Sequence, residues 1–149
     1  MFSSVAHIGF TVSDLDQSVA FYKDILGLAY VGEMVMEGPS TEALFQREGA
    51  TARVAYLKTA DEHAPLVELI QFCDVASQQD TPSLFKTSIS EFCFMVDDID
   101  AEYERLLGLG VKFLSAPQTF DSTEYGFGKS RAVYLFDPDG NILELIQSL

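Results

Sequence analysis

The sequence contains no tryptophan, only two cysteines and few basic side chains. Nine Lys and Arg stand against 23 Asp and Glu among 149 residues, which gives a net charge of −14. A chain this acidic repels the phosphates of nucleic acids and of anionic membrane surfaces, so neither is expected as a partner. The sequence also lacks an apolar run near the ~18 residues that a membrane span needs. No basic region followed by an apolar stretch marks a secretory signal. We therefore expect a cytoplasmic protein.

The two cysteines do not show the spacing of a metal-binding pair. Cys73 and Cys93 both lie in apolar, strand-like runs. This placement favours two buried thiols in an intracellular protein, with a disulfide between them as the alternative.

The overall composition is that of a globular domain. Apolar residues make up 48% of the chain and charged residues 21%, which is ordinary for a folded protein. The length predicts one domain over residues 1–149. A chain of this size buries roughly 68–70% of its unfolded surface, so no metal is needed merely to hold it together.

The chain contains an internal repeat. His7-Ile-Gly-Phe-Thr-Val is echoed by Glu91-Phe-Cys-Phe-Met-Val, and Arg53-Val-Ala-Tyr-Leu is echoed by Arg131-Ala-Val-Tyr-Leu. A third pair is Glu68-Leu-Ile-Gln and Glu144-Leu-Ile-Gln. Three echoes in the same order indicate a duplication, because chance supplies one such pair far more easily than three.

Each half predicts a strand, a helix and three further strands. Asp14 or Asp16 is expected to cap the first helix, and Asp98 or Asp100 the second. We expect module one over about residues 1–73, a linker over 74–87 and module two over 88–149. The predicted strands are 4–12, 29–36, 51–58 and 66–72, then 88–96, 111–115, 131–136 and 142–147. Loops are expected at 38–50 and 118–130.

Strand alternation places four chemically active side chains on the sheet faces away from the helices. These are His7, Glu68, Glu91 and Glu144. A carboxylate in the middle of an apolar strand is costly to bury without a partner, and Glu68 and Glu144 stand at matching places in the two halves. Taken singly, a His near a strand start such as His7 is more often a surface or otherwise satisfied histidine than a ligand, and Glu91 is the weakest candidate because an exposed residue at a strand start is the alternative.

If the modules lie side by side, these four side chains converge. One imidazole and three carboxylates form a mixed nitrogen and oxygen site that suits one divalent ion such as Zn, Ni, Mn, Fe or Co. Three carboxylates in one place also need a cation to balance their charge.

These motifs resemble the vicinal oxygen chelate superfamily, which includes glyoxalase I, methylmalonyl-CoA epimerase, extradiol dioxygenases, and fosfomycin and bleomycin resistance proteins. The resemblance covers nearly the whole chain. It rests on His7-Ile-Gly-Phe-Thr-Val, Phe21-Tyr-Lys-Asp-Ile-Leu-Gly-Leu28, Val67-Glu-Leu69 and Asp137-Pro-Asp-Gly-Asn-Ile-Leu-Glu-Leu145. It implies an α+β fold of two tandem βαβββ modules that form a curved, mixed eight-stranded sheet around a cleft, with the helices on the outer face. The family's metal ligands come from the first and last strand of each module, which are the positions of the four side chains above.

The chain is most like the glyoxalase I or methylmalonyl-CoA epimerase branch. This implies a lyase (lactoylglutathione lyase-like), an isomerase or an epimerase that acts on a small substrate with vicinal oxygens through a metal-stabilised enediolate. By similarity to glyoxalase I, Glu144 is the first choice for the general base and Glu68 the second. The use of glutathione stays open. The family also implies a homodimer, and the modules pair either within one chain or across two.

One departure from the family bears on the activity. Glu91 stands where many members have a second His, and the extradiol dioxygenases and fosfomycin enzymes use two His. The alternative function is therefore a metal-free, small-molecule binding protein similar to bleomycin resistance proteins, which hold a cationic drug in an acidic cleft.

Four further residues are weaker candidates for substrate binding. Tyr56 and Tyr134 precede the carboxylate strands, and a hairpin turn at Asp139 places Tyr134 opposite Glu144. Either tyrosine orients a substrate or is an ordinary strand aromatic. Arg53 and Arg131 either meet an anionic substrate or lie at the surface.

Overall fold

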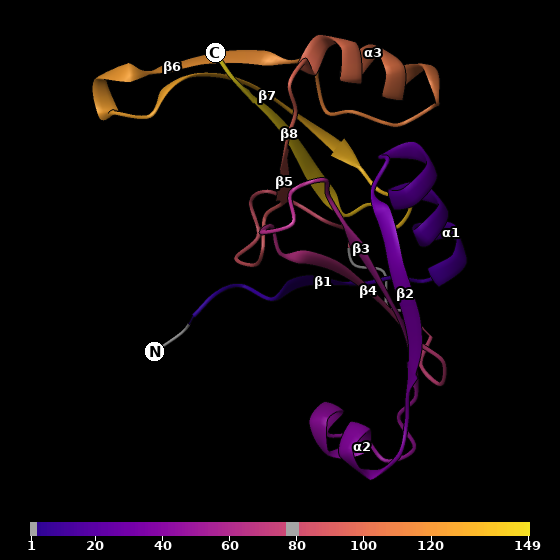
Figure 1. The fold of residues 1–149 in the computed structure, drawn as a ribbon. Helices are drawn as coiled ribbons and strands as arrows, with labels where there is room; N and C mark the ends of the chain where they lie inside the picture. Colours follow the sequence, from indigo (N-terminus) through magenta and orange to yellow (C-terminus); the bar gives the residue numbers. More distant parts are fainter. Residues whose placement is uncertain (1–2, 77–80) are drawn as a thin grey trace. The chain divides into compact units, whose positions relative to one another are not determined.

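The computed structural model describes residues 3–76 and 81–149. Its contacts divide the chain into two compact units, Met1–Gln79 (unit one) and Asp80–Leu149 (unit two), and Figure 1 shows the elements of both. Residues 77–80 of the predicted linker lie outside the described residues.

Unit one is a βαβββ module with one additional helix. Its four strands are ordered β1-β4-β3-β2; β1 and β4 are parallel and the other neighbours are antiparallel. The elements are β1 His7–Thr11, α1 Leu15–Ala20 with a π-helical extension at Phe21–Ile25, β2 Ala29–Met36, α2 Pro39–Phe45, β3 Ala52–Lys58 and β4 Leu66–Phe72.

Unit two repeats this arrangement. Its strand order is β5-β8-β7-β6, again with one parallel pair, β5 and β8. The elements are β5 Phe92–Met95, α3 Ile99–Gly108, β6 Gln118–Ser122, a 3₁₀ turn at Thr123–Tyr125, β7 Gly128–Phe136 and β8 Ile142–Ser148. The predicted tandem βαβββ modules are confirmed. The strands form two four-stranded sheets, and the joining of these sheets around one cleft stays a prediction.

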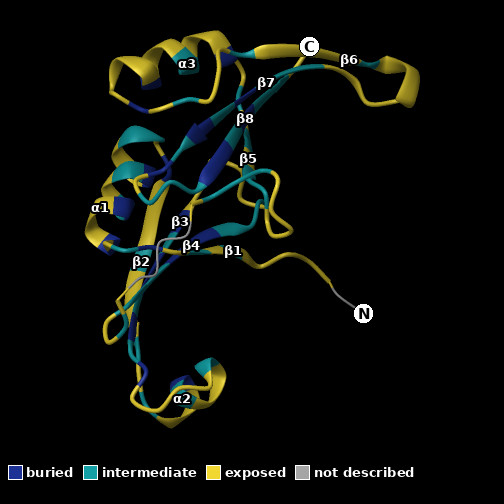
Figure 2. Cartoon of the chain, turned by 180° about the vertical axis from the view of Figure 1, so that it is seen from behind, coloured by how far each residue is buried: buried dark blue, intermediate teal, exposed yellow. Residues whose placement is uncertain are grey.

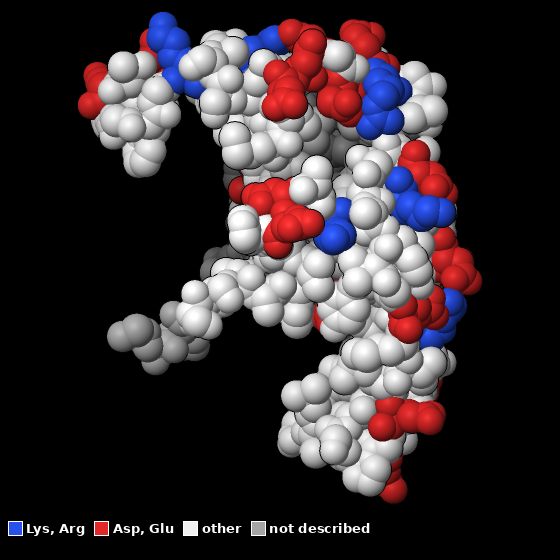
Figure 3. Space-filling model, viewed as in Figure 1, with Lys and Arg blue, Asp and Glu red and all other residues white. Residues whose placement is uncertain are grey.

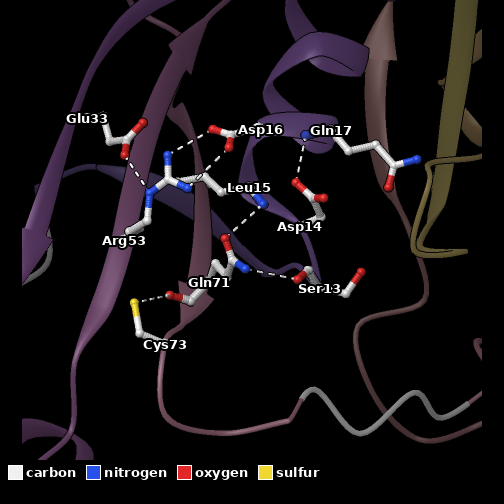
Figure 4. Close-up of polar contacts among 9 residues, drawn as sticks. All are labelled: Ser13, Asp14, Leu15, Asp16, Gln17, Glu33, Arg53, Gln71 and Cys73. Atoms are coloured by element: carbon white, nitrogen blue, oxygen red, sulfur yellow. Dashed lines mark hydrogen bonds and ion pairs between the residues drawn. The ribbon is translucent and has the colours of Figure 1, made fainter.

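A glutamine of the last strand fixes the start of the helix in each unit. The side chain of Gln71 accepts from Leu15 N at 3.1 Å and donates to the Ser13 carbonyl at 3.1 Å, as Figure 4 shows. Gln147 does the same for α3, accepting from Ile99 N and donating to the Asp97 carbonyl. The repeated Glu-Leu-Ile-Gln motif therefore directs its Gln to the helix face and its Glu to the opposite face.

In each unit the helix is capped by the first of the two aspartates that the sequence suggested. Asp14 accepts from Gln17 N at 3.0 Å, and Asp98 accepts from Ala101 N at 3.0 Å. These bonds satisfy backbone donors that the first helical turn leaves without partners.

The buried apolar side chains gather in the central strands of each sheet (Figure 2). In unit one, α1 contacts β3 and β4; in unit two, α3 contacts β8. The central strands bury Ala52, Val54, Ala55, Leu57, Val67 and Leu69 in unit one, and Val133, Leu135, Ile142, Leu143 and Leu145 in unit two.

Two loop predictions and one strand prediction were wrong. Residues 39–45 form a helix, in which Pro39 occupies the first turn, where a missing N–H costs nothing. Residues 118–122 form the edge strand β6 where a loop was expected. The strand predicted at 111–115 is reduced to one bridge between Phe113 and Leu135.

The cysteine prediction also needs correction. Cys73 and Cys93 are free thiols, and both residues are exposed. Cys93 lies on the sheet face away from α3, and Cys73 follows the end of β4, so an apolar neighbourhood in the sequence did not bury either of them. Among the described residues, no helix is long and apolar enough to cross a membrane.

Candidate functional site

Glu68 is a buried carboxylate at the centre of the sheet in unit one. Only 8% of the residue is exposed. Its Oε1 accepts a hydrogen bond from the Tyr56 hydroxyl at 2.5 Å, and its Oε2 lies 3.4 Å from His7 Nε2. The three residues come from neighbouring strands, because β4 lies between β1 and β3. The sequence prediction that His7 and Glu68 share a face is confirmed.

A glycine makes room for this carboxylate. Gly9 of β1 pairs with Glu68 in the register, and a Cβ built on Gly9 would lie 3.1 Å from Glu68 Oε2. That distance is tighter than ordinary van der Waals contact. Glu68 therefore lies close against β1 because residue 9 has no side chain.

The carboxylate of Glu68 changes the pKa of the Tyr56 hydroxyl. The hydrogen bond to Glu68, together with burial and the carboxylate charge, raises the pKa of Tyr56 to about 12. The phenol stays protonated at neutral pH and keeps donating to Glu68.

Unit two places Glu144 in the equivalent position but surrounds it differently. Tyr134 of β7 pairs with Glu144 of β8, which confirms the predicted opposition, and Cys93 of β5 pairs with Glu144 on the other side. Desolvation, a hydrogen bond with Glu144 and the charges of Glu144 and Glu91 raise the pKa of the Cys93 thiol to about 12. Burial and the charges of Glu144 and Glu91 raise the pKa of Tyr134. The structure thus brings Glu91, Glu144, Cys93 and Tyr134 together.

The two carboxylates differ because Cys93 occupies the position of Gly9. In unit one the carboxylate lies against the glycine and is held by a tyrosine and a histidine. In unit two a thiol fills that space, and Glu144 remains half-buried at the edge of a hollow. Glu144 is accordingly the more accessible of the two carboxylates.

The hollow beside Glu144 belongs entirely to unit two and has a volume of about 310 Å³. Its walls come from β6, β7 and β8 and from the segment before β6. The residues that line it include Ser115, Gln118, Phe120, Ser130, Tyr134 and Glu144. A pocket of this volume is at the small end of the range for ligand sites in proteins.

The two arginines lie on the opposite, helix-bearing sides of their strands. Arg53 is held between Asp16 of α1 and Glu33 of β2 at 2.8 Å from each (Figure 4). Arg131 forms an ion pair with Asp100 of α3. These contacts lower the pKa of both aspartates. The ion pairs of Arg53 and Arg131 connect each helix to its sheet. A role of either arginine in substrate binding stays a prediction.

Acidic side chains are spread over the face shown in Figure 3, and the few basic groups lie near them. The ion pairs of Arg47 with Asp74 and of Lys129 with Asp121 follow the same pattern. Both candidate carboxylates therefore belong to a protein whose surface favours neutral or cationic ligands.

Of the candidate metal ligands, His7 and Glu68 lie 3.4 Å apart in unit one, whereas Glu91 and Glu144 in unit two both act on the pKa values of Cys93 and Tyr134. Within residues 3–76 and 81–149, no group of three or more His, Cys, Asp or Glu side chains is placed to hold a metal ion. The chemistry of each pair suits a divalent ion, since imidazole and carboxylate groups bind Zn, Mn, Fe, Co and Ni.

Sequence reasoning missed three residues of the site, Cys93, Gln118 and Phe120. Cys93 has no role in the site predicted from the sequence, although the repeat aligns it with Gly9. The lining residues Gln118 and Phe120 were assigned to a loop. In a strand, residues 118, 120 and 122 lie on one face, and only this spacing could have shown that Gln118 and Phe120 line the site.

Comparison with known proteins gives a consistent family assignment. The family model described as Glyoxalase/Bleomycin resistance protein/Dioxygenase superfamily matches residues 4–145. A curated relative, 2-epi-5-epi-valiolone epimerase from an Actinomyces species, is 30% identical over 147 residues, which cover 96% of this chain and 78% of the relative.

Solved structures show the same fold. A glyoxalase family protein from Bacillus cereus has a TM-score of 0.85 at 22% identity, covering 100% of this chain and 96% of that one. A fosfomycin resistance protein from Listeria monocytogenes, solved with Mn(II) and sulfate, has a TM-score of 0.61 at 19% identity, covering 100% of this chain and 95% of that one.

Proposed function

Because the chain belongs to the Glyoxalase/Bleomycin resistance protein/Dioxygenase superfamily, we propose that it is a metal-dependent enzyme that removes and returns a proton at a carbon next to a carbonyl group. Epimerisation is the reaction we favour among the lyase and isomerase reactions of this kind. The observation that carries the proposal is Glu144, a half-buried carboxylate at the edge of a small hollow and opposite a tyrosine. The relative named as an epimerase supports the reaction class.

We assign the metal to His7 and Glu68 of unit one and Glu91 and Glu144 of unit two. Their donor atoms are those that first-row divalent ions prefer. When bound, such an ion acts as a Lewis acid toward vicinal oxygens of the substrate and stabilises the negative charge that develops as the proton leaves.

Glu144 is our choice for the general base. A base must reach the proton that it removes, and Glu144 lines a hollow that a small ligand can enter. Glu68 already accepts from Tyr56 and lies beside His7, so its carboxylate is held for binding. A proton that Glu144 returns arrives on the side from which it was removed, so inversion of the stereocentre requires a second acid that delivers a proton to the opposite side.

Tyr134 and Cys93 flank this carboxylate. Both are protonated at neutral pH at their ordinary pKa values, and burial and the nearby carboxylates raise these pKa values further. Cys93 pairs with Glu144 in the sheet, and the Tyr134 hydroxyl is available to orient a substrate oxygen.

We further propose a cytoplasmic homodimer. The edge strand β2 exposes Val31 (53%) and Val35 (59%), and apolar side chains on an unpaired edge favour association. Two free thiols fit a reducing compartment. Sedimentation equilibrium tests the dimer directly.

Solvent deuterium incorporation tests the proposed reaction. The full chain, supplied with a divalent metal, is expected to exchange the hydrogen next to the carbonyl of a hydroxy ketone, and Glu144→Gln is expected to lose at least about 100-fold in rate, the lower range for a lost general base. Glu124→Gln, in the exposed turn before β7, is the matched control and should exchange at the normal rate. A metal-free protein that binds hydroxy ketones without exchange would instead be a binding protein of the bleomycin-resistance type.

A further inference from the structure

The tyrosine and the glutamate that are bonded to each other in unit one are separate in unit two. In unit one the Tyr56 hydroxyl donates to Glu68 at 2.5 Å. Tyr134 and Glu144 occupy the equivalent register on β7 and β8. In the described residues of unit two, the charge of Glu144 acts on the Tyr134 phenol, but no hydrogen bond joins the two groups. A ligand can therefore lie between this hydroxyl and this carboxylate, where a direct bond closes the space in unit one.

Both groups line the hollow of about 310 Å³, and they reach it from different strands. Opposed side chains on neighbouring antiparallel strands have their Cβ atoms about 4.5–5.5 Å apart. Tyr134 enters from β7 with the longer side chain, and Glu144 enters from β8. A carbon atom that is bound between them has the hydroxyl on one side and the carboxylate on the other.

Tyr134 is also the proton donor of suitable strength in this hollow. Among the described residues that line it, only Tyr134 and Glu144 carry ionisable side chains; the serine hydroxyls and the Gln118 amide are far weaker acids. Cys93 pairs with Glu144 from β5, on the side away from Tyr134. Because a phenol is protonated at neutral pH, Tyr134 begins the reaction with the proton that inversion requires.

We propose that Tyr134 is the second acid, which delivers a proton to the side of the reacting carbon opposite Glu144. This inference rests on the proposed function, in which Glu144 removes the first proton. As the C–H bond breaks, the proton goes to the Glu144 carboxylate and the electron pair moves into the neighbouring carbonyl group. The O–H bond of Tyr134 then breaks as a new C–H bond forms on the other side, which inverts the stereocentre and leaves a phenolate.

The two groups then return to their starting states. A carboxylic acid is a stronger acid than a phenol, so the proton on Glu144 passes through water to the Tyr134 phenolate. The cycle consumes no other reactant, because one proton leaves the carbon and one proton is added to it.

Deuterium exchange and inversion, measured together, test the inference. The full chain with added Zn²⁺ is incubated in D₂O with each enantiomer of 3-hydroxypentan-2-one, and the products are followed by NMR and chiral chromatography. The two ends of this ketone differ, so inversion is distinguished from migration of the carbonyl group. The wild type should convert each enantiomer into the other, with deuterium at the stereocentre.

The variants should separate the two steps. Tyr134→Phe is expected to lose at least about 100-fold in the rate of inversion, the lower range for a lost acid. It should still exchange the hydrogen of the one enantiomer in which that hydrogen faces Glu144, with the configuration retained, because Glu144 returns a deuteron to the side from which it took the proton. Glu144→Gln should lose this exchange.

Tyr125→Phe is the matched control, because Tyr125 is 71% exposed in the turn before β7. It should invert both enantiomers at the wild-type rate. The inference is overturned if Tyr134→Phe inverts at the wild-type rate, or if it loses exchange of both enantiomers together with inversion, as a purely structural role would require. Wild-type exchange without inversion would also overturn it and would still uphold proton removal by Glu144. A wild type that exchanges neither enantiomer would instead contradict the proposed function itself.

Discussion

The hydroxyl of Tyr56 donates to Glu68 Oε1 at 2.5 Å, across two neighbouring strands of unit one. The equivalent residues of unit two, Tyr134 and Glu144, face each other in the same register, but there Cys93 of β5 pairs with Glu144 in the position of Gly9. Residue 9 is a glycine and residue 93 is a cysteine. We attribute to this difference that Glu68 is buried and held, whereas Glu144 is accessible.

Removing the Tyr56 hydroxyl should destabilise the fold. Tyr56→Phe leaves the buried Glu68 carboxylate without its hydroxyl donor, and a hydrogen bond to a charged group contributes about 1.5–3 kcal/mol. We expect a loss of that order in the free energy of unfolding, measured by urea denaturation at pH 7. Tyr134→Phe is the control and should cost less. Equal losses in the two variants would contradict the difference between the units.

The raised pKa of Tyr56 predicts a pH dependence of stability. Below pH 10 the phenol is protonated in both the folded and the unfolded chain. As the pH rises from 10.0 toward about 12, the unfolded chain loses this proton first, so the stabilisation from Tyr56 declines. The difference in unfolding free energy between the wild type and Tyr56→Phe should therefore shrink over this range. A difference that stays constant up to pH 12 would show that the phenol is not held by Glu68.

The close approach of Glu68 to Gly9 predicts a sensitive glycine. Gly9→Ala places a methyl group 3.1 Å from Glu68 Oε2, and the carboxylate cannot move without loosening its contacts with Tyr56 and His7. We expect a loss of about 1–3 kcal/mol in unfolding free energy, as for overpacking. Gly32→Ala in β2 meets nothing within 4 Å and should be neutral or slightly stabilising. Thermal unfolding of the two variants makes the comparison, and a neutral Gly9→Ala would refute the tight fit.

The two exposed thiols should differ in reactivity. Alkylation requires the thiolate, and Glu144 helps to raise the pKa of Cys93 to about 12. Iodoacetamide at pH 8 should therefore modify Cys73 well before Cys93, as followed by mass spectrometry of tryptic peptides. Glu144→Gln should speed the reaction of Cys93 and leave Cys73 unchanged. Faster alkylation of Cys93 in the wild type would place its thiol away from the carboxylate.

The repeat made much of the fold predictable. The Glu-Leu-Ile-Gln echo places Glu68 and Glu144 on one face and Gln71 and Gln147 on the other, and strand alternation alone is enough to read this. The opposition of Tyr134 and Glu144 followed from the turn at Asp139. Local rules of this kind depend on a few adjacent residues, so one sequence is sufficient to apply them.

The predictions that were wrong concern features that depend on tertiary contacts. Gly38-Pro39-Ser40-Thr41 is equally typical of a loop and of a helix start, and burial of Thr41 with the ring contact of Phe45 on Phe72 accompanies the helix. The edge strand β6 is formed by pairing with β7 rather than by its own polar sequence. The exposure of Cys93 likewise depends on which face of the sheet the helix covers.

Metal content is the most direct test of the central proposal, a divalent metal ion held by His7, Glu68, Glu91 and Glu144. The wild-type chain, purified without chelator and measured by inductively coupled plasma mass spectrometry, should contain about one divalent ion per chain. His7→Ala and Glu144→Gln should each lose this ion, while His63→Ala, in the loop between β3 and β4, should keep it. Wild-type protein that is metal-free, takes up no added divalent ion and is equally stable with and without chelator would contradict the account.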